Sequence, residues 1–181
     1  MLRSCRLSRG VSLWELLVSM AIAGTLAAAA LPSFSLTGAR ARLVASHNLL
    51  IGSLHYARST AILRNVPTAV CLSADGERCM LQAGAAARGW LVFHDVARHG
   101  AVQLETGDTL LRHVEVPAPV TVRGSRAAVT YWPVSLAGTT STFLFCHPGR
   151  AADGRAIIVS QSGRPRTAVD GAWTARLECP A

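Results

Sequence analysis

The sequence predicts an α+β protein in which one long, kinked N-terminal α-helix packs on a C-terminal antiparallel β-sheet domain. Residues 1–64 combine an apolar segment with a helical repeat of apolar residues. Residues 65–181 instead contain short runs rich in Val, Ile, Thr and aromatic residues, separated by Gly-containing turns. These runs include no amphipathic segment of helix length, so the apolar side of the N-terminal helix must be buried against a sheet.

The first ten residues form a basic leader that contains Arg3, Arg6 and Arg9 and no acidic residue. The next segment, Val11–Leu31, is apolar except for one charged residue, Glu15. A helix of about 20 apolar residues spans a bilayer, and a basic flank stays in the cytoplasm. The sequence therefore predicts a single membrane-spanning helix that sends the rest of the chain outward. Because an acid in a bilayer is costly, Glu15 is expected to have a function, with snorkelling to the interface as the alternative.

Residues 32–64 are predicted to form the amphipathic half of the same helix. Pro32 is expected to kink it, a regular helical repeat begins at about Thr37, and Asn65-Val66-Pro67 is a stop signal. The apolar residues of this half recur at helical spacing and define one face. They are Leu43, Leu50, Leu54, Ala57 and Ala61.

The globular domain, residues 65–181, is predicted to be built from antiparallel strands. Gly-containing dipeptides such as Asp75-Gly76 and Pro148-Gly149 mark the turns between them. The expected strands are Thr68–Ser73, Trp90–His94, Thr109–Val114, Ala128–Val134, Ser141–Cys146, Arg155–Gln161 and Thr174–Leu177.

Four cysteines remain beyond Cys5, which lies in the leader: Cys71, Cys79, Cys146 and Cys179. An even number of cysteines in an exported domain predicts disulfides. Three pairings are open, and we favour Cys71–Cys79, which closes a hairpin, together with Cys146–Cys179, which ties down the C-terminus. Zinc is the rival interpretation, but the sequence has no C-x-x-C or H-x-x-x-H pair.

The N-terminal pattern resembles the leader of type IV pilins, usually seen as G-F-T-L-x-E. Here a basic residue and Gly10 are followed, after four residues, by Glu15 and a long apolar helix. The resemblance implies that a prepilin peptidase cleaves after Gly10 and methylates the new N-terminus, Val11. It also implies that Glu15 pairs with the N-terminal amine of a neighbouring subunit, which would neutralise a buried charge. The alternative is a plain single-pass anchor.

Motifs along the rest of the chain resemble the GspH/FimT family of pilin-like proteins. In order, they are Val70–Cys79, Gly89–Asp95, Phe145–Cys146, Ser162–Arg166 and Cys179–Pro180. The resemblance implies a minor pilin or pseudopilin that assembles with other pilins in a filament. It also implies that the protein is anchored in the bacterial inner membrane. Its C-terminal domain would then lie in the periplasm, or outside the cell when the protein is part of a pilus. Two contexts stay open: a type IV pilus, in which some members bind DNA for uptake, and a type II secretion system, in which a protein H-type pseudopilin acts in secretion.

A G-R-x-R motif, formed by Gly163, Arg164, Pro165 and Arg166, resembles that of the DNA-binding pilins. Pro165 keeps its neighbours extended, and alternate residues of an extended segment share one face about 6.6–7 Å apart. Arg164 and Arg166 would thus present two guanidinium groups to successive phosphates, without reading the base sequence. The alternatives are a solvated turn and an Arg pair that meets an acidic neighbouring subunit.

The overall charge is consistent with anion binding, since the formal net charge is +8 and all 18 basic residues are Arg. A GC-rich genome, which favours Arg and Ala codons, is the simpler explanation of this bias. Further basic residues that could widen a positive strip near the motif are Arg150, Arg155 and Arg176.

No enzymatic activity, metal or cofactor is expected. The six histidines are scattered, and the sequence lacks a nucleophile elbow, a phosphate-binding glycine loop and a paired-carboxylate signature. Isolated histidines in such a domain are expected to be surface or packed residues.

Overall fold

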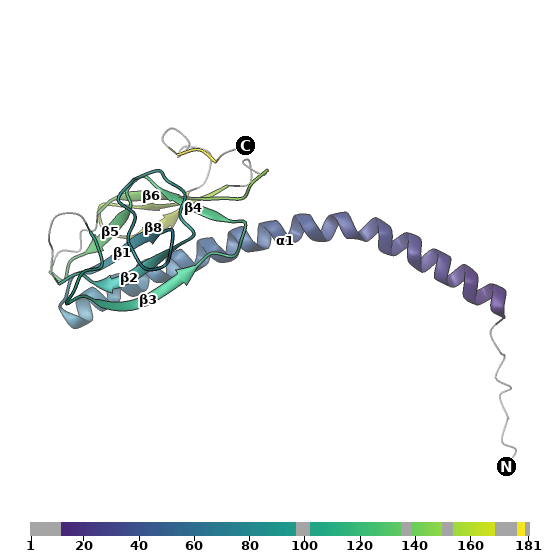
Figure 1. The fold of residues 1–181 in the computed structure, drawn as a ribbon, viewed down its shortest axis with the longest axis horizontal. Helices are drawn as coiled ribbons and strands as arrows, with labels where there is room; N and C mark the ends of the chain where they lie inside the picture. The colour runs from purple at the N-terminus through teal and green to yellow at the C-terminus, as the bar shows by residue number, and fades with distance from the viewer. Residues whose placement is uncertain (1–11, 97–101, 135–138, 150–153, 169–176, 180–181) are drawn as a thin grey trace, which may run out of the picture. The chain divides into compact units, whose positions relative to one another are not determined.

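A computed structural model describes residues 12–96, 102–134, 139–149, 154–168 and 177–179, and for residues 28–36 it describes only the backbone (Figure 1). The chain divides into two compact units, Met1–Gly38 and Ala39–Ala181. The first unit contains the N-terminal part of the helix, and the second contains the rest of the helix and all of the strands.

The two predicted helical stretches form one helix, α1 (Leu13–Arg64), which continues through Pro32. The residues around this proline are mostly Ala and Leu, which have high helix propensity. Within the stretches given above, no helix combines the length and the apolar character needed to cross a membrane.

In the second unit, α1 buries one face in the main core. The five apolar residues predicted from their spacing are all buried: Leu43, Leu50, Leu54, Ala57 and Ala61. Leu54 is 0 % exposed, whereas Leu63 in the last turn is 81 % exposed. The helix therefore packs through one stripe and leaves the other side open, as the 3.6-residue period requires.

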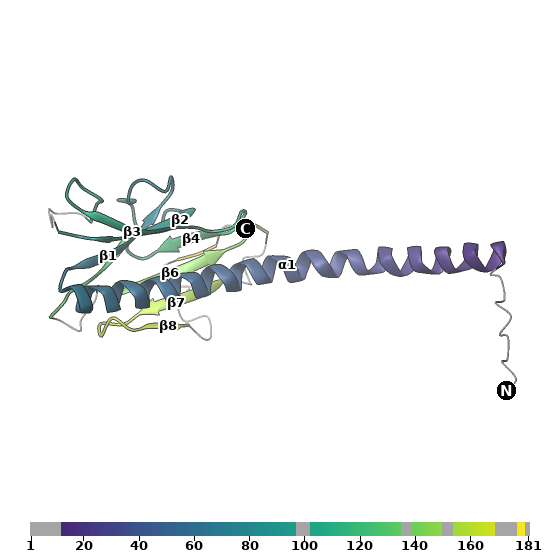
Figure 2. The same cartoon turned by 90° about the horizontal axis from the view of Figure 1, so that it is seen from below.

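Eight strands form two four-stranded antiparallel sheets, with strand orders β3-β2-β1-β5 and β4-β6-β7-β8 (Figures 1 and 2). We call them sheet A and sheet B in that order. The strands are β1 (Thr68–Ser73), β2 (Gly89–His94), β3 (Thr109–Glu115), β4 (Thr121–Gly124), β5 (Ala128–Tyr131), β6 (Ser141–Cys146), β7 (Arg155–Val159) and β8 (Pro165–Thr167).

Two predicted strands are shorter in the structure than the sequence suggested. Strand β5 ends at Tyr131 rather than at Val134, and β7 ends at Val159 rather than at Gln161. Strand β7 stops because the chain turns immediately afterwards, with the Gly163 N–H donating to the Ser160 carbonyl at 2.8 Å.

Two strands were missed by the sequence analysis. Strand β4 is only four residues long and β8 only three, and β8 begins with a proline. Short edge strands give little periodic signal, and proline usually argues against a strand. Of the expected strand Thr174–Leu177, residues 174–176 lie outside the described residues, and Leu177 belongs to no strand.

The main core joins α1 to the inner faces of both sheets. It includes Trp90 from sheet A and Phe145 from sheet B, whose rings meet edge-on at 6.3 Å between centroids. The Trp90 indole N–H donates to Ser53 Oγ on α1 at 3.0 Å, and this hydrogen bond is buried. The pair fixes the helix against sheet A, because an unpaired indole N–H in this core would be costly.

Each sheet also carries a smaller apolar cluster on its outer face, which we define as the face turned away from α1. Cys71 and Phe93 belong to the outer cluster of sheet A. Leu144, Ala156 and Leu177 belong to that of sheet B. Strand β1 is therefore buried along its whole length, since both of its faces are covered.

Candidate functional site

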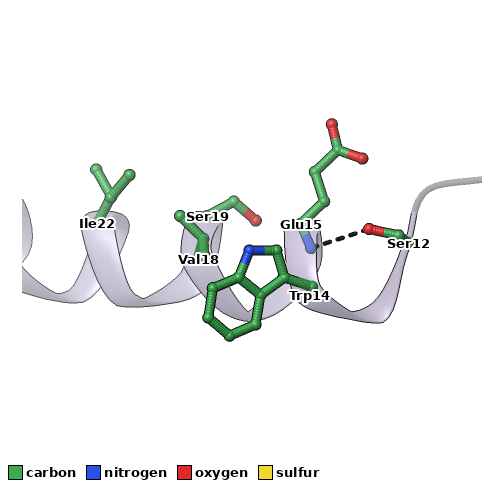
Figure 3. Close-up of a pocket in the computed structure, with 6 residues that line it drawn as sticks. All are labelled: Ser12, Trp14, Glu15, Val18, Ser19 and Ile22. Carbon is green, nitrogen blue, oxygen red and sulfur yellow. Dashed lines mark hydrogen bonds between the residues drawn. The ribbon is translucent and has the colours of Figure 1, made fainter.

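The N-terminal turn of α1 contains Glu15, whereas the predicted cleavage and methylation positions, Gly10 and Val11, lie outside the described residues. The Glu15 main-chain N–H donates to Ser12 Oγ at 3.2 Å, so Ser12 caps the helix (Figure 3). The order Ser-x-x-Glu is that of a capping box, and an acid in the first turn interacts favourably with the helix dipole. Ser12 therefore supplies the N-cap of α1, which the sequence analysis overlooked, and the Glu15 side chain makes no hydrogen bond back to Ser12 in this turn (Figure 3).

The same turn exposes a mixed apolar and polar surface. The side chain of Trp14 is 75 % exposed. A shallow hollow on this surface is lined by Ser12, Trp14, Glu15, Val18, Ser19 and Ile22 (Figure 3). Exposed apolar side chains on a long helix indicate a surface that a partner or a membrane covers.

The G-R-x-R motif lies at the end of the β7–β8 hairpin. The hairpin is closed by the Ser160 N–H, which donates to the Arg164 carbonyl at 3.2 Å, and Gly163 adopts a left-handed conformation with φ of 72°. A three-residue hairpin loop needs this conformation at its last position, which explains the glycine. Gly163 is buried, while Arg164 and Arg166 are exposed.

The strand register shows which face these arginines occupy. Ile157 and Val159 of β7 point into the main core, so Ile158 between them points to the outer face of sheet B. Arg166 pairs with Ile158, and partners in an antiparallel pair share a face. Arg164 lies two residues before Arg166 and so takes the same face. The structure therefore brings Arg164 and Arg166 together on one exposed surface.

Strand β8 is an edge strand whose free side is unsuited to further strand pairing. The Ala168 N–H donates to the Ala156 carbonyl at 2.9 Å, so positions 164, 166 and 168 turn their main chain toward β7. The main-chain groups of Pro165 and Thr167 then face the unpaired side of β8, and Pro165 has no N–H that could donate to another strand. Proline at such a position blocks the addition of another strand, so contacts at this edge are left to side chains.

The outer face of sheet B is divided into an apolar half and an open half. In the open half, Thr142 of β6 and Ile158 of β7 are half-buried and lie in register with Arg166. In the apolar half, Leu144, Ala156 and Ala168 are packed with Leu177 of the C-terminal segment. We call the open half, with Arg164 and Arg166, the arginine face.

The other arginines suggested by the sequence do not extend this face. Arg155 pairs with Phe145, whose side chain lies in the main core, so Arg155 takes the opposite face of sheet B from Arg166. Arg150 and Arg176 lie outside the described residues. Of the described arginines that the sequence suggested, only Arg164 and Arg166 therefore lie on the arginine face. Arg123 of β4 shares the outer face of sheet B, but it pairs with Leu144 at the opposite edge of the sheet and donates to the Gly84 carbonyl at 3.1 Å.

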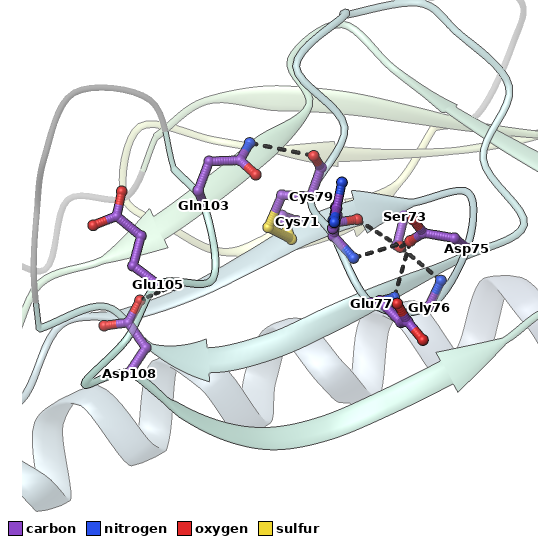
Figure 4. Close-up of a disulfide and its surroundings, with 10 residues drawn as sticks. Cys71, Ser73, Asp75, Gly76, Glu77, Cys79, Gln103, Glu105 and Asp108 are labelled. Carbon is purple, nitrogen blue, oxygen red and sulfur yellow. Dashed lines mark hydrogen bonds between the residues drawn. A yellow bond between two sulfur atoms is a disulfide. The ribbon is translucent and has the colours of Figure 1, made fainter.

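The four remaining cysteines form the two disulfides that the sequence analysis favoured, Cys71–Cys79 and Cys146–Cys179. Cys71–Cys79 closes the loop after β1 (Figure 4). Cys146–Cys179 links β6 to the C-terminal segment across 33 positions of the sequence. Zinc binding by these four cysteines is therefore ruled out in this state, since disulfide sulfur has no thiolate to offer.

The loop closed by Cys71–Cys79 is a tight polar turn centred on Asp75 (Figure 4). The Asp75 carboxylate accepts the main-chain N–H groups of Arg78 and Glu77, both at 2.9 Å. These bonds lower the pKa of Asp75 from 3.8 to about 2. Gly76 has φ of 81°, a conformation that strains any other residue, and a side chain there would also push aside the exposed His113 ring. This turn has a structural role, which its D-G signal indicated.

Two polar side chains, His47 and Tyr131, are buried in the main core, and among the described residues His47 Nε2 and the Tyr131 hydroxyl have no hydrogen-bond partner. His47 is 3 % exposed and meets the Phe145 ring edge-on at 6.1 Å between centroids. Tyr131 is buried in sheet A, and this burial raises its pKa. Both pack as large, mostly apolar groups.

A family model described as "Type II transport protein GspH" matches residues 47–163, which is more than half of the chain. The chain belongs to the GspH family. The match begins within α1 and ends at Gly163, so Arg164 and Arg166 lie directly beyond it. The GspH family is one of structural pilin and pseudopilin subunits, and it implies a membrane-associated, periplasmic location.

Solved structures show the same pilin-like fold for this GspH-family chain. The type IV minor pilin FimU of Pseudomonas aeruginosa matches with a TM-score of 0.53 and 20% identity, over 72% of this chain and 90% of that one. The minor pseudopilin EpsH from the Type 2 Secretion System of Vibrio cholerae matches with a TM-score of 0.51 and 14% identity, over 72% of this chain and 98% of that one. No curated protein sequence matches the chain. At these identities the structural likeness establishes the fold alone.

Proposed function

We propose that this GspH-family protein is a minor pilin or pseudopilin that is cleaved after Gly10, methylated at Val11 and assembled into a filament from the bacterial inner membrane. In this proposal residues 11–31 hold it in the membrane before assembly, and residues 65–181 fold in the periplasm. The observation that carries the proposal is the first turn of α1. It combines exposed apolar side chains with one acid, Glu15, at the N-terminal end of the helix.

This combination favours assembly over simple anchoring. When the apolar surface around Trp14 is covered by neighbouring helices, the nearby Glu15 carboxylate is withdrawn from water as well. A carboxylate without a partner in such a place is strongly destabilising. The N-terminal amine that cleavage creates on a neighbouring subunit supplies the missing positive charge.

The experiment is a maturation assay in cells that contain the prepilin peptidase. Gly10→Val should leave an uncleaved precursor, detected by its larger mass and by the absence of N-methylation. Gly24→Ala is the matched control, because a methyl group there meets no atom within 4 Å, and it should mature normally. Normal processing of the Gly10 variant would rule out the assigned cleavage position.

A second function, capture of extracellular DNA, is favoured by the arginine face. Arg164 and Arg166 are both exposed, share a face and flank a proline that keeps the segment extended. Their spacing of about 6.6–7 Å suits two phosphates of one nucleic-acid strand. Such contacts hold the backbone of DNA and do not distinguish sequences.

The test is a titration of the full-length protein in mild detergent against duplex DNA at several salt concentrations. Arg164→Ala/Arg166→Ala should weaken binding to all sequences and reduce the slope of log K against log salt by about 2, one unit for each lost phosphate contact. Arg155→Ala is the matched control, because Arg155 lies on the other face of sheet B. If the double variant bound as tightly as the wild type, the assigned site would be wrong.

The alternative context is a type II secretion system, which the description of the matching family favours. In that context the same assembly helix serves a pseudopilin, and the arginine face meets an acidic neighbouring subunit. Deletion of the gene separates the two contexts. Loss of transformation with normal secretion supports the pilus, and loss of secreted enzymes with normal transformation supports the secretion system.

A further inference from the structure

The C-terminal segment packs beside the arginine face, although it contains none of the residues assigned above to DNA. We propose that the Cys146–Cys179 disulfide and the Leu177 side chain form a clamp that holds β8 on sheet B and thereby positions Arg166. This inference rests on the proposed DNA binding only in its assumption that Arg166 contacts a phosphate of DNA. The clamp itself is a matter of packing, and it can be tested without DNA.

Strand β8 needs such support because its own pairing is weak. It is three residues long and pairs only with β7. Two main-chain hydrogen bonds mark its ends: the Ser160 N–H donates to the Arg164 carbonyl, and the Ala168 N–H donates to the Ala156 carbonyl. Short edge strands with so few bonds belong to the least stable parts of a fold and open readily.

The clamp acts on the end of β8 that lies beyond Arg166. Ala168, two residues after Arg166, packs against the same cluster as Leu177. Leu177 is only 5 % exposed and lies among Leu144 of β6 and Ala156 of β7. Leu177 and Ala168 therefore belong to one apolar cluster at the end of β8.

The disulfide fixes Leu177 in this position. Cys179, two residues after Leu177, is bonded to Cys146, the last residue of β6. Strand β6 lies inside sheet B between β4 and β7, so the C-terminal segment is tied to a strand that is paired on both sides. The loop that the disulfide closes contains both β7 and β8, and closing it restricts how far β8 can move away.

The consequence for binding is pre-organisation. A guanidinium group on a frayed strand must be ordered before it can meet a phosphate, and this ordering lowers affinity. With the clamp in place, Arg166 is held in register with Ile158 and beside Arg164. Arg166 remains the contact residue, while Leu177, Cys146 and Cys179 are positioning residues.

The first experiment measures hydrogen exchange of the Ala168 amide in the full-length protein in mild detergent. Cys146→Ala/Cys179→Ala and Leu177→Ala should each raise its exchange rate by about tenfold or more, because β8 opens more often. Leu177→Met, which keeps the side-chain volume, should restore slow exchange. Cys71→Ala/Cys79→Ala is the matched control, because that disulfide lies on sheet A, and it should leave Ala168 unchanged.

The second experiment repeats the DNA titration with the same variants. Loss of the clamp should weaken binding several-fold while the slope of log K against log salt stays as in the wild type, since both arginines can still reach phosphates. Loss of the two arginines should instead reduce that slope.

The outcomes separate the two proposals. Unchanged exchange at Ala168 in the Cys146/Cys179 variant would overturn the clamp, and faster exchange with unchanged DNA affinity would overturn its positioning role. A wild-type protein that bound no DNA at low salt would overturn the proposed DNA function, and the exchange result alone would then decide the clamp.

Discussion

At the scale of single residues, several polar side chains have local structural roles that decide where elements begin and turn. Ser12 caps α1, and Ser53 accepts the indole N–H of Trp90 inside the core. Asp75 organises the turn closed by Cys71–Cys79 through two charge-assisted bonds from main-chain N–H groups. Each of these groups is satisfied by atoms close to it, so its role can be tested by a single substitution.

The lowered pKa of Asp75 predicts a specific pH dependence of stability. Main-chain N–H groups of Arg78 and Glu77 hold the pKa of the folded state at about 2, below the ordinary value of 3.8. The stabilising effect of the charged form is therefore complete above about pH 4 and is lost as the pH falls through 2. Asp75→Asn keeps an oxygen acceptor but cannot titrate, so its stability should depend less on pH.

Thermal unfolding between pH 2 and 4 checks this prediction. The difference in melting temperature between the wild type and Asp75→Asn should shrink as the pH is lowered. Glu77→Gln is the control in the same turn, since Glu77 supplies a main-chain N–H to it, and should follow the wild-type curve. Parallel curves for the wild type and Asp75→Asn would contradict the assignment.

At the scale of elements, the two parts of α1 differ in how they bury their apolar side chains. Its first turns, around Trp14, expose apolar side chains, whereas the part in the second unit buries a regular stripe against both sheets. The strands of the two sheets also differ in burial, because β1 of sheet A is buried on both faces and β8 of sheet B is an exposed edge strand. Stability is therefore expected to be concentrated around β1, β6 and the buried stripe of α1, and binding at the edges.

The buried stripe of α1 predicts a strong contrast between two leucines of the same helix. Leu54→Ala removes a 0 % exposed side chain from the core and should lower the free energy of unfolding by about 3 kcal/mol. Leu63→Ala removes an 81 % exposed side chain and should change it by less than about 0.5 kcal/mol. Denaturant unfolding of both variants measures the difference, and equal losses would show that the packing of α1 is misassigned.

At the scale of the whole molecule, the chain separates assembly from binding. The residues proposed for filament assembly lie in the first unit, and the arginine face lies near the C-terminus in the second. Two disulfides stabilise the second unit, one on each sheet. The residues proposed for assembly and those proposed for DNA binding can therefore be changed independently of each other.

The two disulfides should contribute unequally to overall stability. In the chain-entropy model, Cys71–Cys79 stabilises the fold by about 2.5 kcal/mol and Cys146–Cys179 by about 4 kcal/mol, because the second closes a longer loop. Replacing each pair with Ala and measuring denaturant unfolding under oxidising conditions gives both values. A larger loss for the short loop would show that packing at Cys71, and not loop closure, dominates.

The sequence by itself determined the features that depend on neighbours along the chain. Helical spacing identified the buried stripe of α1, and turn chemistry located β1, β2 and β6 to within one residue. The order of motifs identified the GspH/FimT resemblance. Local pattern was sufficient in these cases because each signal lies within a few residues of the structure it specifies.

Only the tertiary structure decided which distant residues share a surface. The sequence placed Arg155 among residues that could extend the basic strip, but strand register turns it to the opposite face from Arg166. The sequence also contained no signal that Leu177 and Ala168 would join one apolar cluster next to the arginine face. A shift of one residue in register reverses the face of every side chain in a strand, and register is set by pairing across the whole sheet.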